Sequence, residues 1–341
     1  MAIRTLAGDA PEAVFAFLDT TVSARGPAHW RWKYRVGAVT EPTALYFDGA
    51  DGQVLGFIGM MPTALHAGGA TCPVAWFMDW HVNQSERTVG VGLGLLRKAE
   101  ALAGTLLTLQ GSLDTRAMLP ELGWRHTDSA RTWIRPLSAR FIGDWLSKRF
   151  AVAPRALAGA AAEVLVLHYR ASPPAGMLPH TLREVTRFSA EYDAVWKARA
   201  IEFAPVMTRD SRYLNYVAAE YPDGGYRLQL LCAGDAPIGH LITRLDDVDG
   251  FRRGRLVDLL WPRGNRDLLL WMIQTAAWDL QTQGADYIDC VASVPDLADA
   301  LERERFDARR SVPLWHHRLP ATMPNPERWY ITFLDCDRAY R

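Results

Sequence analysis

The sequence predicts an α+β fold made of two similar units, each a mixed, mostly antiparallel sheet flanked by helices. Three observations support this prediction. The chain has 341 residues, a length that suggests two domains. Strand-like and helix-like segments follow one another in the same order in both halves. A glycine-rich turn joins a long apolar strand to an apolar helix at residues 79–100, DWHVNQSERTVGVGLGLLRKAE.

The first unit is expected to contain two short helices, a hairpin, a strand, a helix and further elements in alternation. We place these at residues 10–24 and 29–35 (helices), 44–48 and 53–61 (a hairpin ended by Pro62), 73–82 (strand), 92–103 (helix), 105–110 (strand), 115–122 (helix) and 131–135 (closing strand).

The second unit repeats this order. A connecting helix and linker are expected at 137–176, with a strand-like stretch at 162–169. We then expect a hairpin at 226–232 and 238–244, a strand at 254–261, a helix at 267–283, a strand at 286–291 and a helix at 295–305.

Composition excludes several classes of function. Hydrophobic residues make up 49% and charged residues 22% of the chain, as in ordinary globular proteins. Lys+Arg and Asp+Glu are equal at 38 each, so charge favours neither a nucleic acid nor a membrane as a partner. We find no apolar run of about 18 residues and no secretory signal, and expect a cytoplasmic protein.

The four cysteines give no sign of a metal site. Cys72, Cys232, Cys290 and Cys336 lie far apart and form no C-x-x-C motif. Neither a zinc site nor a disulfide framework is therefore predicted.

The turn after the strand at 73–82 is the main functional signal. Gly90, Gly92 and Gly94 are spaced G-x-G-x-G, which matches neither the Walker A loop nor the dinucleotide fingerprint. Glycine lets the backbone approach a ligand closely, and the first turn of the helix has free N–H groups. These features suit a pyrophosphate. The alternative is a strand–helix turn that binds nothing.

The segment Arg87-Thr88-Val89-Gly90-Val91-Gly92 fits the pattern Arg/Gln-x-x-Gly-x-Gly/Ala and follows Val82 by five residues. It resembles the coenzyme A pyrophosphate loop of the GNAT superfamily of acyl-CoA-dependent N-acyltransferases. The resemblance implies tandem GNAT-like domains and an acyl-CoA cofactor, which we expect to be acetyl-CoA. It implies cofactor contacts by Val82, Asn83, Arg87, Thr88, Val89, Gly90, Val91 and Gly92.

The resemblance also implies the domain organisation. Residues 1–136 would be the catalytic, CoA-binding GNAT domain, 137–176 the connecting helix and linker, and 177–341 a GNAT-like domain with a degenerate loop. The turn at 261–267, WPRGNRD, keeps only Gly264 and lacks the Gly-x-Gly pair. Asp258 falls where Asp79 falls in the first unit.

Some looser motifs narrow the resemblance. The segments 29–34, 210–216 and 329–337 are similar to those of tandem GNAT proteins associated with bacterial polysaccharide biosynthesis. In GNAT folds the first helices flank the acceptor cleft, so Trp30, Trp32 and Tyr34 are candidates for substrate contact. The alternative, which we prefer, is that these aromatic residues pack the helix on the sheet.

The candidate catalytic residues are Asp79 and His81. They alternate with Trp80 and Val82, so both lie on one face of the strand. The pair is suited to removing a proton from an amine, and imidazole has the more suitable unperturbed pKa. Alternatively, Asp79 holds a backbone or arginine group and His81 is an ordinary strand residue. The helix at 115–122 lacks the tyrosine that often serves as general acid in GNAT enzymes.

The sequence therefore predicts an acyl-CoA-dependent N-acyltransferase that acts on a small-molecule amine such as an amino sugar. Two alternatives remain open. One is a FemABX-like aminoacyl-transferase, which the duplication favours. The other is a non-catalytic CoA-binding or scaffold protein, which the missing tyrosine favours.

Overall fold

The computed structural model describes residues 2–36, 42–84, 90–149, 155–177, 179–335 and 337. The first half of the chain forms a sheet covered by helices. Its elements are β1 (Ala2–Thr5), α1 (Glu12–Thr21), α2 (Pro27–Lys33), β2 (Ala44–Asp48), β3 (Val54–Ala67), β4 (Ala70–Val82), α3 (Val91–Ala103), β5 (Leu106–Leu109), α4 (Leu113–Glu121) and β6 (Arg125–Pro136).

The second half follows after two connecting helices and repeats the order hairpin, strand, helix, strand, helix, strand. Its elements are α5 (Ala139–Arg149), α6 (Arg155–Tyr169), β7 (His180–Val185), α7 (Tyr192–Phe203), β8 (Val206–Met207), α8 (Ser211–Leu214), η2 (Asn215–Ala219), β9 (Tyr226–Ala233), β10 (Ala236–Val248), β11 (Phe251–Leu260), α9 (Arg266–Thr282), β12 (Tyr287–Ala292), α10 (Pro295–Arg303), β13 (Asp307–His317) and η3 (Pro326–Arg328).

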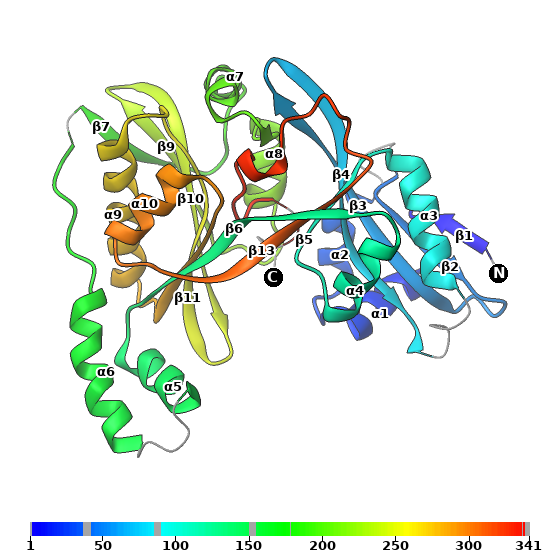
Figure 1. The fold of residues 1–341 in the computed structure, drawn as a ribbon, viewed down its shortest axis with the longest axis horizontal. Helices are drawn as coiled ribbons and strands as arrows, with labels where there is room; N and C mark the ends of the chain where they lie inside the picture. Colours follow the sequence, from blue (N-terminus) through cyan, green and yellow to red (C-terminus); the bar gives the residue numbers. More distant parts are fainter. Residues whose placement is uncertain are drawn as a thin grey trace.

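The described strands join into one sheet in which the last strands of the two halves change places. The order is β1-β2-β3-β4-β5-β13-β6-β12-β11-β10-β9-β7, and β8 pairs with β3. β13 runs antiparallel to β5, and β6 runs antiparallel to β12, while β6 and β13 pair with each other. Figure 1 shows these two long strands crossing between the halves. The expected closing strand at 131–135 therefore exists, but its neighbours come from the second half.

Two clusters of buried side chains hold the fold together. The smaller cluster packs α3 against one face of the first sheet, through residues such as Ile58, Phe77 and Leu95. The larger cluster begins under α1 with Val14, Phe15 and Leu18 and continues into the second half. The two halves therefore share one core, and burial of its apolar surface opposes their separation.

Two sequence expectations about these elements are wrong. Pro62 does not end its strand, because β3 continues to Ala67. Residues 162–169 belong to the helix α6 and not to a strand. The first half of α6 is rich in alanine, at positions 156, 158 and 160–162, and alanine is the best helix former. Its last carbonyls are also held, since Arg135 Nε donates to Tyr169 O at 2.8 Å.

Among the described helices, none combines the length and the apolar character that crossing a membrane requires. The described residues also contain no group of three side chains placed to hold a metal ion.

Candidate functional site

The neighbouring parallel strands β4 and β5 separate from each other and leave a cleft. They pair only at Ala75 with Leu106 and at Trp76 with Leu107. β4 then runs on to Val82, while the chain after β5 turns away, and Gln110 N donates to Pro313 O at 2.9 Å. A cavity of about 550 Å³ opens between the two diverging ends. Such a volume is ordinary for a small-molecule site.

Both halves of the chain contribute to the walls of this cleft. From the first half it is lined by Val22, Phe77, Met78, Asp79, Trp80, His81, Thr108, Leu109, Gln110, Gly111, Ser112 and Thr115. From the second half it is lined by Arg253, Arg255, Asp289, Phe333 and Asp337. Ten of these lining residues have a charged, hydroxyl, amide or imidazole side chain, so the cleft suits a polar reactant.

Asp79 lies at the centre of the buried polar contacts beside the cleft. Its Oδ2 accepts hydrogen bonds from Lys33 Nζ and from Tyr34 OH, each at 2.5 Å. Lys33 Nζ also lies 3.3 Å from Asp337 Oδ2, so one buried ammonium group faces two buried carboxylates. Burying these charges is tolerable only because they are paired.

The backbone at Asp79 is strained. Its φ is 47°, and β4 contains one extra residue there relative to β3, since Met78 pairs with Gly59 and His81 with Phe57. This is a β-bulge, a feature that redirects side chains and is common beside active sites. A left-handed non-glycine residue at such a place indicates a functional constraint.

The second strand end carries a similar distortion. Gln110 has φ 68° and Gly111 has φ 89° at the turn from β5 into α4. Ser112 then caps α4, with its Oγ accepting from Thr115 N at 3.1 Å. Left-handed residues therefore flank the cleft on both strands, and the turn presents the hydroxyl groups of Ser112 and Thr115 to it.

The alternation expected along β4 is present in part. Trp80 and Val82 pack against the cluster under α3, and Asp79 and His81 line the cleft together with part of Trp80. The structure thus brings the two candidate catalytic residues to one cavity. Their catalytic role stays a prediction.

The N-terminus of α3 lies beside the end of β4. Trp80 Nε1 donates to Gly92 O at 3.2 Å, and a Cβ on Gly92 would come within 3.1 Å of Val82 Cγ2. Gly92 therefore allows the helix to pack closely on the strand. Gly90 is the N-cap residue, with φ 79°, and a Cβ there would meet nothing within 4 Å.

The first turn of α3 has no side-chain cap and no acidic residue, and the N–H of Gly94 is bonded to Gly90 O. The preceding N–H groups of the helix are those that an anion would occupy. Val91 and Gly92 belong to this turn. The expected contacts of Arg87, Thr88 and Val89 lie outside the described residues.

The two strand residues predicted to contact the cofactor differ in orientation. Asn83 N donates to Leu55 O at 2.9 Å, so its amide is used within the sheet. Backbone groups alternate in direction along an antiparallel strand, and the Val82 N–H therefore points away from β3, toward the open side. Of the two, Val82 is therefore the residue whose amide is not directed at β3.

The aromatic residues in and just after the second helix pack in the protein interior and are not exposed on its surface. Trp30 is buried, and its Nε1 donates to Asp19 Oδ1 at 2.5 Å. Trp32 Nε1 donates to Tyr216 O at 3.0 Å, across to the second half. Tyr34 is buried and reaches Asp79. Substrate contact by these three residues stays a prediction, since the described lining of the cleft does not include them.

The corresponding cleft in the second half is filled by the protein itself. Tyr330 OH donates to Leu259 O at 2.5 Å, and Ile331 N donates to Ser293 Oγ at 2.8 Å. The segment at 329–335 thus lies between the ends of β11 and β12. Trp329, Tyr330 and Ile331 are fully buried there.

Asp258, the counterpart of Asp79, is also enclosed. Burial opposes its ionisation, but Arg209 and the hydrogen bonds from His240 and Thr332 outweigh burial and lower its pKa. Arg209 Nη2 also binds Asp335 at 2.7 Å, and burial raises the pKa of that carboxyl. This ion network has no solvent exposure and reads as structural.

The helix that follows β11 is capped where α3 is not. Asn265 Oδ1 accepts from Leu268 N at 3.1 Å, and Asp267 stands in the first turn of α9. An amide oxygen and a carboxylate therefore occupy the place that an anion would need.

Sequence reasoning missed the residues that the second half brings to the cleft, namely Arg253, Arg255, Asp289, Phe333 and Asp337. The only local signal was Asp337 within the aromatic segment at 329–337. The missed residues from the first half, Gln110, Ser112 and Thr115, follow a strand end and precede a helix, which is a position that favours ligand binding in sheets.

Among the comparisons with known proteins, the one with solved structures finds similar folds. No protein-family model matches the chain. No curated protein matches it either. Saccharomyces cerevisiae N-myristoyltransferase with bound myristoyl-CoA is similar, with a TM-score of 0.66 at 12% identity over 97% of this chain and 86% of that one.

Two further structures agree. A GCN5-related N-acetyltransferase from Anabaena variabilis gives a TM-score of 0.61 at 13% identity, covering 92% of this chain and 72% of that one. A probable N-acyltransferase from Enterococcus faecalis gives 0.59 at 12% identity, covering 92% and 71%. The chain therefore has the fold of the GNAT superfamily, which GCN5-related N-acetyltransferases and N-myristoyltransferase share.

Proposed function

We propose that the protein is an acyl-CoA-dependent N-acyltransferase whose reaction takes place in the cleft between β4 and β5. The observation that carries the proposal is the arrangement of three parts at one place. These are the uncapped N-terminus of α3, the outward-facing amide of Val82, and a polar cavity that contains Asp79 and His81.

The diphosphate of the acyl-CoA donor fits the N-terminus of α3 and does not fit the N-terminus of α9, its counterpart in the second half. Val91, Gly92 and the following residue would direct N–H groups and the positive end of the helix dipole at a diphosphate. At α9 the Asn265 side chain already accepts such a hydrogen bond. Of these two described helix N-termini, we propose the one at α3 as the donor site, and the cap at α9 supports the expected degenerate loop in the second half.

The carbonyl of a bound thioester would lie near the end of β4. Val82 N–H would donate to its oxygen as negative charge develops there. A thiol leaves with a pKa near 8.5, so a strong general acid is less necessary than for an alcohol. This agrees with the absence of tyrosine from α4.

The acceptor end suits an amine. Asp79, Asp289 and Asp337 contribute carboxylate oxygens to the cavity as hydrogen-bond acceptors for an amine, while Lys33, Arg253 and Arg255 balance their charge. His81 would take the proton that the amine must lose, and Asp79, held by Lys33 and Tyr34, would fix the local geometry. Because polar side chains dominate the cavity, we propose acetyl as the acyl group and an amino sugar or small amine as the acceptor.

Binding of acetyl-CoA to purified protein tests the donor site directly. Calorimetry should give saturable binding to the wild-type protein, and Gly90→Glu should abolish it, because a carboxylate would stand among the helix N–H groups. Gly104→Glu is the matched control, since Gly104 closes the other end of α3 with φ 71° and equally open space.

The proposal predicts that Gly104→Glu binds as the wild type does. Equal loss in both variants would indicate a general effect on the helix, and absence of binding at millimolar acetyl-CoA would contradict the proposal. Thiol release with a panel of amines and amino sugars would then identify the acceptor and exclude a purely binding role.

A further inference from the structure

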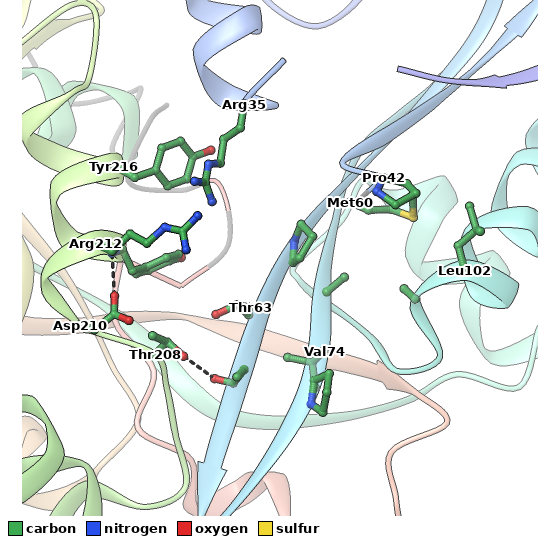
Figure 2. Close-up of a pocket in the computed structure, with 16 residues that line it drawn as sticks. Arg35, Pro42, Met60, Thr63, Val74, Leu102, Thr208, Asp210, Arg212 and Tyr216 are labelled. Atoms are coloured by element: carbon green, nitrogen blue, oxygen red, sulfur yellow. Dashed lines mark hydrogen bonds between the residues drawn. The ribbon is translucent and has the colours of Figure 1, made fainter. Parts of the chain in front are cut away.

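A second cavity, of about 540 Å³, lies at a different place and shares no lining residue with the cleft between β4 and β5. Figure 2 shows it between the strands β3 and β4 on one side and α8 with η2 on the other. It therefore lies where the two halves of the chain meet.

The cavity exists because β3 lacks a neighbour over a short stretch of its edge. Met60 N donates to Thr43 O, and Thr208 N donates to Ala64 O. Between these bonds stands Pro62, whose carbonyl points into the gap by the alternation of an antiparallel strand. Proline has no N–H to satisfy, which explains why it is tolerated there.

Most of the wall is apolar, with one buried hydroxyl. The apolar side chains lining the cavity are Pro42, Met60, Pro62, Ala64, Pro73, Val74, Ala75, Leu102 and Ala103. Thr63 Oγ1 is buried and has no hydrogen-bond partner among the described residues. A buried polar atom normally has a partner, so this hydroxyl favours a ligand or water.

Two arginines stand at one side of the cavity. Arg35 places its guanidinium 5.0 Å from the centre of the Tyr216 ring, and its backbone has φ 47°. Arg212 comes from α8. Within the described part of the chain, neither arginine forms an ion pair. Asp210, which also lines the cavity, accepts from Tyr213 N at 2.7 Å as the cap of α8.

We propose that this cavity binds a small monocarboxylate with an apolar body, its carboxylate on Arg35 and Arg212 and its chain along Met60, Ala75 and Leu102. Guanidinium groups bind carboxylates with paired hydrogen bonds. An extended peptide fits less well, because Pro62 offers an acceptor and no donor to a pairing strand. The cavity shares no residue with the cleft, so the proposal is independent of the transferase reaction.

Binding of sodium octanoate to the full chain tests the proposal, with hexanoate and decanoate as length variants and octan-1-ol as the uncharged probe. Octanoate should bind at least about tenfold more tightly than octan-1-ol. The double variant Arg35→Gln/Arg212→Gln should weaken octanoate by a similar factor and leave octan-1-ol unchanged. Arg187→Gln, an exposed arginine that pairs with Glu220, is the matched control and should bind as the wild type does.

Filling the cavity gives a second measurement. Ala64→Phe should abolish octanoate binding while calorimetric binding of acetyl-CoA persists, and circular dichroism would verify that the variant is folded. Three results would overturn the proposal. Octanoate does not bind at millimolar concentration, it binds with the same affinity as octan-1-ol, or its affinity is unchanged in both the double variant and the Ala64→Phe variant. Tighter binding of an unrelated extended peptide at the same site would overturn it in favour of a strand-pairing partner.

Discussion

At the scale of single residues, the cleft between β4 and β5 contains a strained backbone at Asp79 and a buried ion pair between Asp79 and Lys33. Asp79 keeps a left-handed backbone, and its carboxylate is held by two donors. Such a group is well fixed in position, whereas His81 lines the same cleft and is only partly buried. Under the proposed reaction, His81 is therefore the residue that receives the proton, and Asp79 is a fixed carboxylate in the wall of the same cleft.

This assignment predicts that His81→Gln lowers kcat by about a hundredfold or more, because a positioned base contributes on that order. The KM for acetyl-CoA should change little, since the donor site lies at α3. Steady-state thiol release measures both. His126→Gln on β6, an exposed histidine, is the control. A His81→Gln variant with wild-type kcat would remove His81 from the mechanism.

A second histidine, His29, is expected to make the stability of the protein depend on pH. His29 packs its ring against Trp30, Trp32 and Tyr221, so it joins α2 to the second half. Burial, helped by the positive charge of Lys33, lowers its pKa to about 4. In the unfolded chain a histidine titrates near 6.5.

The folded protein therefore binds fewer protons than the unfolded chain between pH 6.5 and 4. The contribution of His29 to the free energy of unfolding is therefore complete above about pH 6.5, and it is lost as the pH falls toward 4. The loss should reach about 3 kcal/mol. Urea unfolding at pH 7 and pH 4.5 should show a smaller loss for His29→Phe, which keeps the aromatic contacts. Equal losses in the two proteins would assign the acid sensitivity to other groups.

At the scale of elements, the N-termini of α3 and α9 differ in how they are capped. α3 begins at a glycine with no side-chain cap, and α9 begins at Asn265 with its own cap. Asn265→Ala should therefore lower the free energy of unfolding by about 1 kcal/mol, as for other N-caps. Gly90→Ala should cost a similar amount through its left-handed backbone alone.

Urea unfolding of the two variants measures this prediction, and calorimetry separates them further. Acetyl-CoA binding should be unchanged in Asn265→Ala, because the cleft beside α9 is filled by the segment at 329–335. A loss of acetyl-CoA binding in Asn265→Ala would mean that the second half holds the donor.

Elements also show how far the sequence alone could go. The strand before the glycine turn and the helix after it were predicted to within a few residues, because local periodicity and the turn residues decide them. Pro62 was misjudged because the gap beside β3 is a tertiary feature. The helix α6 was misjudged because Val164, Leu165 and Leu167 make an apolar run that periodicity does not assign. Asp79 and His81 line one cleft, as expected, but the β-bulge at Asp79 interrupts the regular alternation of β4, and the sequence did not indicate that bulge.

The whole molecule explains what sequence could not provide. Arg253, Arg255 and Asp337 reach the cleft only because the last strands exchange and the C-terminal segment crosses between the halves. The periodicity and the motif spacing of the sequence do not predict which strands pair, so they could not predict this exchange. The same segment fills the cleft of the second half and supplies Asp337 to Lys33 in the first.

Exchange of β6 and β13 predicts that neither half folds alone. A fragment of residues 1–136 would leave the edge of β5 without β13, and β6 without both β13 and β12. It would also expose the part of the shared core that the second half covers, so it should aggregate or remain unfolded. The full chain should unfold in one transition, with tryptophan fluorescence and circular dichroism giving coincident curves.

Co-expression distinguishes exchange from simple instability of fragments. Residues 1–149 and 155–341, produced as two chains, should copurify and bind acetyl-CoA, because every strand then finds its partner while only the connection between α5 and α6 is cut. Fragments 1–136 and 177–341 expressed singly are the controls. A folded, monomeric 1–136 fragment that binds acetyl-CoA would show that β13 is dispensable to the donor site, and that the halves are independent domains despite the strands they share.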